Sequence, residues 1–152
     1  MKKYFKFFLY GLTYLALIIL FAVMFIVTTK ADVIALVAPI WNFRMPAILE
    51  GWIDKVLAPP WAFSFKTIFG NYGNPVGNLT GKKAIVFCTY GSPQFAIRTF
   101  FLNMPTKRLR RGVFNICGIK DVTYKRYFAV PFVSDKKRMK FLDDVKQTVN
   151  KL

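Results

Sequence analysis

The feature that most restricts the fold of this chain is a run of 20 residues without a charge, from Phe8 to Val27. A helix rises about 1.5 Å per residue, so such a run crosses the roughly 30 Å hydrocarbon core of a bilayer. A signal peptide has a shorter apolar region of about 7 to 15 residues, and Thr29-Lys30-Ala31 is a poor cleavage site. The run therefore predicts one transmembrane helix, with a signal peptide and a buried core helix as the alternatives.

Lysines around this run bear on its orientation. Lys2, Lys3 and Lys6 precede it, whereas Lys30 and Asp32 follow it and cancel. The positive-inside rule then favours a cytoplasmic N-terminus, with the following domain on the far side of the membrane. We expect a single-pass membrane protein, and the side of the domain stays open because the chemistry inferred below conflicts with this orientation.

Composition excludes several classes of protein. The chain has 23 Lys and Arg against 7 Asp and Glu, a net charge of +16, yet 55% of its residues are hydrophobic. It is too apolar for a basic disordered tail or a typical nucleic-acid-binding domain. The absence of histidine removes Ser-His and Cys-His catalytic pairs and His-ligated metals. Cys88 and Cys117 share no metal-ligand spacing, so we predict no metal site and two buried cysteines.

Residues 1–29 form the basic N-terminus and the membrane helix in this interpretation, and residues 30–152 form one domain in which strands alternate with helices. Apolar, β-branched runs predict strands, the first two of them fully buried. The predicted strands are Ala31–Ile40, Lys82–Thr89 and Asp121–Val130, and the predicted helices are Pro46–Leu57, Thr106–Cys117 with Gly118 as its cap, and Ser134 or Asp135 to about Asn150. The alternation predicts an α/β fold with a parallel sheet covered by helices.

Two helices carry apolar faces that we expect to turn inward. The faces consist of Ile48, Leu49, Trp52, Ile53 and Val56 on the first helix, and of Met139, Leu142, Val145 and Val149 on the last. Between the first helix and the second strand, the segment Ala58–Gly81 is rich in Pro and Gly. It predicts a long loop, with a short hairpin near Asn71-Tyr72-Gly73 as a further possibility.

Two loops leave the carboxyl ends of the first two strands, where open parallel sheets bind their ligands. The first, Pro39–Pro46, is aromatic and holds two prolines, and the second, Thr89–Pro93, offers backbone amides and hydroxyl groups. An apolar platform beside a polar loop suits a flat heteroaromatic ligand with a polar rim. The alternative is that Trp41 and Phe43 only pack beneath the next helix.

The segment Ala38–Val56, APIWNFRMPAILEGWIDKV, resembles the signature P-L-W-W-x-x-P-A-x-L-K-G-W-x-D-R-V of flavodoxin-like NAD(P)H:quinone oxidoreductases. Trp61–Phe63, Gly81–Ala84 and Phe114–Lys120 resemble later segments of the same family, in the same order. Together the matches cover about Ala31 to Leu152.

This resemblance implies FMN or FAD as cofactor, NAD(P)H as co-substrate and a quinone or azo dye as acceptor. It implies hydride transfer through the flavin, so a histidine is not required and the catalytic residues stay unknown. By the resemblance, one loop backs the flavin ring and the other binds its pyrimidine side. The cofactor-binding residues are then Pro39, Ile40, Trp41, Asn42 and Phe43 in the first loop and Thr89, Tyr90, Gly91 and Ser92 in the second.

The chain departs from the family's pattern in three ways. The family's first strand, phosphate loop and second strand have no counterpart, and the apolar run stands in their place. The first strand is central in a sheet of order 2-1-3-4-5, so the segment Val33–Val37 becomes an exposed edge that the N-terminal helix, a second copy or a partner protein must cover. Asn42, Arg44 and Glu50 also replace the family's usual residues, and Arg44 could block the ring or favour reduced flavin.

These departures motivate two alternatives. One is a non-catalytic relic of the family that serves as a structural or interaction subunit in a membrane assembly. The other is an N-terminus that results from a frameshift or an incorrect gene model.

Positive charge concentrates in the last part of the chain, where residues 82–152 contain 16 Lys and Arg against 4 acidic residues. A solvated helix face is the first interpretation, followed by contact with anionic lipid headgroups. Binding of the 2′-phosphate of NADPH and binding of nucleic acid are the last two interpretations. We do not expect a nucleic-acid partner, because no recognised binding motif is present. Two clusters carry this charge: Lys107, Arg108, Arg110 and Arg111, and then Lys136, Lys137, Arg138 and Lys140.

Overall fold

The computed structural model of the chain describes residues 2–151, and their side chains from Leu12 onward. It divides into two compact units, Met1–Ala31 and Asp32–Leu152. The first unit is helix α1 (Lys2–Lys30), whose segment Leu12–Lys30 is long and apolar enough to cross a membrane. The polar side chains at its end are satisfied within the helix, since the Thr28 hydroxyl donates to the Met24 carbonyl at 2.7 Å.

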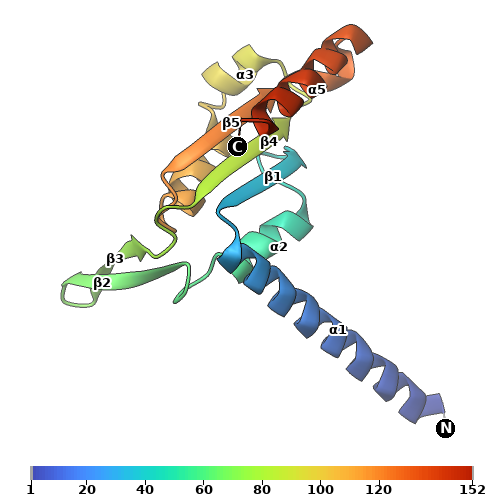
Figure 1. Cartoon of the computed structure of the whole chain (residues 1–152), viewed down its shortest axis with the longest axis vertical. Helices are drawn as coiled ribbons and strands as arrows, with labels where there is room; N and C mark the ends of the chain where they lie inside the picture. Colours follow the sequence, from blue (N-terminus) through green and yellow to red (C-terminus); the bar gives the residue numbers. More distant parts are fainter. Residues whose placement is uncertain (1, 152) are drawn as a thin grey trace. The chain divides into compact units, whose positions relative to one another are not determined.

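The second unit contains a parallel sheet of three strands in the order β1-β4-β5, coloured blue, green and orange in Figure 1. These strands are β1 (Val33–Pro39), β4 (Lys83–Thr89) and β5 (Asp121–Tyr127). They are aligned without a shift, so Pro39, Thr89 and Tyr127 lie side by side at the carboxyl edge. The predicted α/β fold with a parallel sheet is confirmed.

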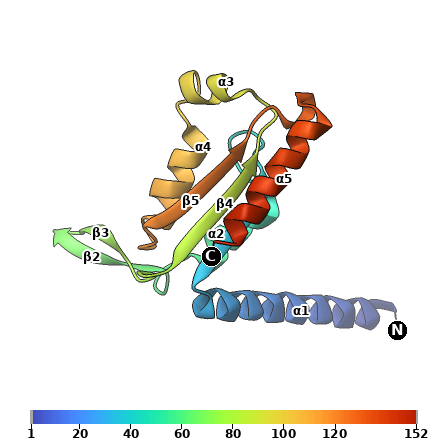
Figure 2. The same ribbon diagram turned by 45° about the horizontal axis from the view of Figure 1, so that its top comes forward.

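Helices cover the two faces of this sheet unequally (Figure 2). One face packs against α2 (Ala47–Val56) and against the continuous helix formed by α4 (Met104–Lys107) and the π-helix η1 (Arg108–Phe114), and it holds the larger core. The other face packs against α5 (Asp135–Val149) through Ile85, Phe87, Tyr127, Phe141 and Val145.

The prediction of inward-facing residues on α5 was wrong for three of the four positions. Val145 packs against the sheet, but Met139, Leu142 and Val149 are exposed. The reason is that α5 contacts the β4 and β5 part of this face and leaves the β1 part uncovered. On α2 the predicted face holds at Trp52, Ile53 and Val56, whereas Ile48 is exposed.

Strand β1 is not fully buried, contrary to the prediction for Ala31–Ile40. Ile34, Leu36 and Ala38 are buried, while Ala35 and Val37 face outward. Within residues 2–151 no strand pairs with the outer edge of β1, so the predicted open edge at Val33–Val37 is present in the described chain. Beside it, an apolar groove of about 450 Å³ runs between β1 and α5.

The predicted loop Ala58–Gly81 contains an antiparallel hairpin of β2 (Phe63–Phe69) and β3 (Tyr72–Gly77), which extends away from the sheet in both ribbon views. Gly77 and Gly118 allow the hairpin base to meet the end of η1, because a Cβ on Gly77 would lie 2.1 Å from the Gly118 nitrogen. The short helices α3 (Gln94–Thr99) and η2 (Val130–Phe132) were not predicted, since neither is long enough to show a period.

Candidate functional site

The two predicted loops meet in one open pocket of about 530 Å³ at the carboxyl edge of the sheet. We call it the loop pocket. Val130 and Pro131 also line it, although they were not among the predicted site residues. They belong to the loop after the third strand, and the rule that ligands bind at the carboxyl ends of strands would have predicted them if it had been applied to that strand. The lining residues are Pro39, Ile40, Trp41, Asn42, Thr89, Tyr90, Gly91, Ser92, Val130 and Pro131. All the predicted site residues except Phe43 therefore line it.

A tight turn shapes the first wall of the loop pocket. Trp41 and Arg44 exchange two backbone hydrogen bonds of 2.8 Å, and the two residues between them have positive φ angles of 48° at Asn42 and 65° at Phe43. Asparagine tolerates this conformation, whereas an aromatic residue in it costs on the order of 1–2 kcal/mol. Phe43 packs on Phe101 with ring centroids 4.7 Å apart, which holds the turn in place.

Trp41 is 65% exposed, so it does not pack beneath the next helix as the alternative proposed. Its ring is available to a ligand. Arg44 is absent from the lining of the loop pocket, so the structure gives no support to the expectation that this cation blocks the site.

The second wall is anchored to the sheet by its own backbone. The Ile40 amide donates to the Thr89 carbonyl at 2.9 Å, and the Tyr90 amide donates to the Tyr127 carbonyl at 2.8 Å. In residues 2–151 the amides of Gly91 and Ser92 donate to no backbone carbonyl. These two N–H groups are consequently available as hydrogen-bond donors at the rim of the loop pocket.

Burial keeps the Tyr90 hydroxyl and both cysteine thiols protonated. Burial, with a smaller effect of Cys88, raises the pKa of Tyr90 to about 12, and its ring stacks on Phe128 with centroids 4.9 Å apart. Burial likewise raises the pKa of Cys88 to about 12 and that of Cys117 to about 11. The prediction of two buried cysteines is confirmed, and neither thiol supplies a thiolate nucleophile at neutral pH.

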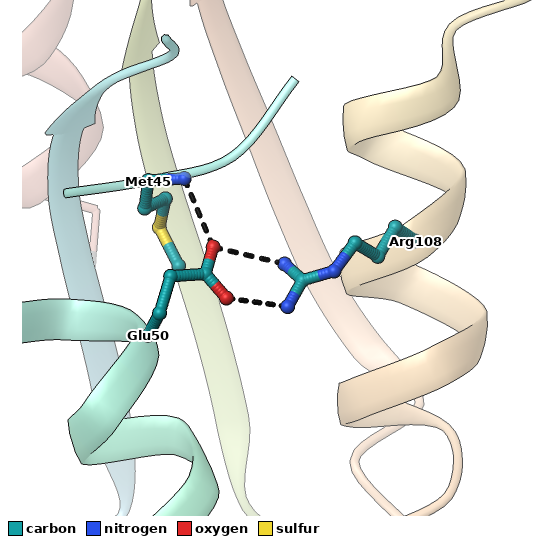
Figure 3. Close-up of polar contacts among 3 residues, drawn as sticks. All are labelled: Met45, Glu50 and Arg108. Carbon is teal, nitrogen blue, oxygen red and sulfur yellow. Dashed lines mark hydrogen bonds and ion pairs between the residues drawn. The ribbon is translucent and has the colours of Figure 1, made fainter. Parts of the chain in front are cut away.

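An ion pair fastens the first loop to the helical layer (Figure 3). The Glu50 carboxylate on α2 accepts a hydrogen bond from the Met45 amide at 2.9 Å and binds both terminal nitrogens of Arg108 on η1, one of them at 3.1 Å. Only 12% of the Glu50 side chain is exposed. The sequence marked Glu50 as a departure from the family's lysine but gave no sign of its partner, which lies 58 residues further along the chain.

Comparisons with known proteins agree with this geometry. The sequence profile of the family described as "Flavodoxin-like fold" matches residues 28–152. An uncharacterized NAD(P)H oxidoreductase of Haemophilus influenzae is 34% identical over 115 residues, which are 75% of this chain and 54% of that protein. An FMN-dependent NADH:quinone oxidoreductase of Ralstonia nicotianae is 35% identical over 96 residues, which are 63% of this chain and 43% of that protein. The chain thus spans about half the length of the curated relatives it matches.

Solved structures show the same fold. The Streptococcus mutans protein Smu.1420 superposes with a TM-score of 0.75 at 31% identity, over 84% of this chain and 64% of that one. An FMN-dependent NADH-azoreductase of Bacillus anthracis, solved with FMN, superposes with a TM-score of 0.72 at 18% identity, over 90% of this chain and 63% of that one. Given the profile match, the parallel sheet and the position of the loop pocket, this chain belongs to the family of proteins with the flavodoxin-like fold.

Proposed function

We propose that this chain is an FMN- or FAD-dependent oxidoreductase that transfers a hydride from NAD(P)H to a quinone-like acceptor. The observation that carries the proposal is the meeting of the Pro39–Asn42 and Thr89–Ser92 loops in one pocket of about 530 Å³. Relatives that are named NAD(P)H oxidoreductase and FMN-dependent NADH:quinone oxidoreductase support it.

The residues of the loop pocket fit a flavin ring. Trp41 offers an exposed aromatic face, and the Gly91 and Ser92 amides are suited to hydrogen-bond the carbonyl oxygens of a pyrimidine edge. A bound flavin supplies two-electron hydride chemistry, and the protein orients it and excludes water. For the phosphate end of the cofactor, the described residues that line the loop pocket include no glycine-rich cradle, and helix α1 occupies the sequence before β1.

Flavin titration of the purified full chain in detergent tests this proposal. FMN, FAD and riboflavin are each titrated, and quenching of flavin fluorescence reports binding. We expect Trp41→Ala to weaken binding at least about tenfold, because base–aromatic stacking contributes about 1–3 kcal/mol. Phe69→Ala is the matched control, since it removes an aromatic ring that is 81% exposed on the hairpin. A chain without yellow absorbance, and without flavin binding at any concentration, would rule out the enzyme.

The second candidate is a non-catalytic relic that acts as a structural or interaction subunit. The open β1 edge and the lack of a phosphate cradle among the lining residues favour it. Turnover of NAD(P)H with a soluble quinone by the purified chain would exclude this alternative. Binding of flavin without turnover would support it.

We also propose that α1 anchors the chain in a membrane as a single span, and that a second copy or a partner protein covers the Val33–Val37 edge. The length and apolarity of Leu12–Lys30 support the anchor. The N-terminal lysines favour a domain outside the cytoplasm, whereas NAD(P)H as substrate requires one inside. Protease treatment of intact vesicles distinguishes the two, because the C-terminal tail is cleaved only when it faces outward.

A further inference from the structure

A second cavity, of about 430 Å³, lies between the α4–η1 helix and the β5 edge of the sheet. It shares no lining residue with the loop pocket. Most of its lining side chains are cations or hydrogen-bond donors, and none is acidic. Those that matter here are Asn103, Lys107, Arg110, Arg111, Tyr124 and Arg126, and we call the cavity the cationic pocket.

The four cations of the cationic pocket have no carboxylate partner in the described part of the chain. The ion pairs there use Lys83, Arg108, Lys125 and Arg138 instead. Arg126 is half-buried, donates to the Asn103 side-chain oxygen at 3.2 Å and lies 6.0 Å from the centre of the Phe128 ring, so its partners among the described residues are neutral. Like charges gathered around one cavity repel one another, and a bound anion would remove that cost.

Tyr124 supplies an independent indication of a ligand. Its hydroxyl oxygen is buried and interacts with the neighbouring Arg110, but it makes no well-aligned hydrogen bond to a described residue, and Tyr124 lines the cationic pocket. An unpaired buried hydroxyl costs about 1–3 kcal/mol. Burial raises the pKa of Tyr124 far above neutrality, so the hydroxyl keeps its proton and can donate it in a hydrogen bond. Arg110 lies beside it, with its guanidinium carbon 5.3 Å from the centre of the ring.

The second basic cluster of the chain, on α5, is a solvated helix face and serves for comparison. On α5, Lys136, Lys137 and Lys140 are exposed, and Arg138 pairs with Asp135. That cluster contains no buried, unpaired hydroxyl. Lys107, Arg110 and Arg111 are exposed as well, so the cationic pocket differs from α5 in its half-buried Arg126 and its buried Tyr124 hydroxyl, which a solvated helix face does not explain.

We propose that the cationic pocket binds a phosphorylated small molecule through a phosphate or pyrophosphate group. Guanidinium groups bind phosphate oxygens in charge-assisted hydrogen bonds, and several cations around one concave site suit a compact anion of high charge. Because the two pockets share no residue, the proposal does not depend on flavin binding at the loop pocket.

Isothermal titration of the full chain in detergent with sodium pyrophosphate tests the site. We expect Arg126→Gln and Arg110→Gln each to weaken binding about tenfold or more, as expected for the loss of a hydrogen bond to a charged group. Lys136→Gln, which removes an equal charge from α5, is the matched control and should leave the affinity unchanged. Absence of binding by the unmodified chain, or equal weakening by the control, would overturn the proposal.

Tyr124→Phe gives a signature that a purely structural tyrosine would not. Removal of an unpaired buried hydroxyl should preserve or raise the thermal stability of the free chain while it weakens pyrophosphate binding about tenfold. A variant that loses stability and keeps its affinity would show that the hydroxyl serves the fold, and would overturn its assignment to the ligand.

Competition experiments then identify the source of the phosphate. Stronger displacement of pyrophosphate by NADPH than by NADH would assign the cationic pocket to a nucleotide phosphate. Stronger displacement by glycerol phosphate or inositol trisphosphate would assign it to a lipid headgroup. Sulfate is the control competitor. If sulfate binds as tightly as pyrophosphate does, the cationic pocket responds to negative charge alone, and that result would contradict a phosphate site.

Discussion

Strands β1 and β4 come from two segments that look alike in the sequence and meet different environments in the fold. Both are apolar runs with β-branched residues, and both fit the pattern of a strand buried on both faces. In β4, the five residues Ala84–Cys88 are all buried. In β1, buried and outward-facing residues alternate, and one edge is open in the described chain.

The difference shows that an apolar strand sequence does not by itself predict which of its side chains the described chain buries. Val37 and Phe87 are register partners on the same face, yet 72% of Val37 is exposed against 4% of Phe87. Helix α5 covers the second and not the first. Hydrophobicity at Val37 is therefore unexplained by the described contacts, which is the basis for a partner on this side of the sheet.

Replacement of each of these two register partners by alanine is the most direct test of the comparison. One of the two variants should show the largest change in the free energy of unfolding among the variants considered. We expect Phe87→Ala to lower the free energy of unfolding by about 3–5 kcal/mol, because it leaves a cavity in the α5 face of the core. Val37→Ala should change it by less than about 0.5 kcal/mol. Urea unfolding of the full chain in detergent measures both. A similar cost for the two variants would mean that β1 is covered in solution.

Glu50 tests how the loop after β1 is held, since no ion pair of the described residues involves the loop after β4. Glu50→Gln should lower the free energy of unfolding by about 2–3 kcal/mol, because it leaves the partly buried Arg108 without a charged partner. A double-mutant cycle with Arg108→Gln checks the assignment. Asp135→Asn, which breaks an exposed pair on α5, is the control and should have no measurable effect. Additive effects of the Glu50 and Arg108 variants would contradict the coupling.

Asp144 on α5 tests the contact between α5 and β5, the strand on the other side of β4. Its carboxylate accepts from Lys125 at 2.7 Å and from the Tyr127 hydroxyl at 2.9 Å, and the Lys125 hydrogen bond is the main cause of its lowered pKa. The resulting stabilisation is present above about pH 4, the ordinary pKa of aspartate, and is lost as the pH falls through the lowered value.

Because Asp144 is partly solvent-exposed, Asp144→Asn should cost at most about 1 kcal/mol at pH 7. Urea unfolding at a series of pH values measures the difference, which should disappear in acid. A difference that does not depend on pH would show that the carboxylate charge is not its source.

Ala35→Pro should have the smallest effect on stability and a specific effect on association. The Asp32 carbonyl and the Ile40 amide bond to the β4 side, so the alternation of a parallel strand directs the backbone of Ala35 to the open edge. Proline there removes a donor that no strand in the described chain uses. Sedimentation velocity should show loss of self-association or of partner binding, whereas Ala35→Ser, which keeps the N–H group, should not. Unchanged association in Ala35→Pro would contradict strand pairing at this edge.

Much of the fold and of the loop pocket could be predicted because the signals were local. The loops Pro39–Phe43 and Thr89–Ser92 follow directly after strands, and a parallel sheet brings strand ends of this kind to one edge. The ion pair of Glu50 with Arg108 and the cationic pocket could not be predicted. Each joins residues from distant segments, and side-chain pairing across elements leaves no period in the sequence.

The sequence by itself determined the apolar helix, the alternation of strands with helices and two of the loops that form the loop pocket, since hydrophobic period and chain direction decide these. The tertiary structure decided which apolar surfaces are covered. It buried Phe87 and left Val37 exposed, paired Glu50 and left Arg126 without a counterion among the described residues. The physical reason is that hydrophobicity is a property of a residue, whereas burial and charge compensation depend on what lies beside it in space.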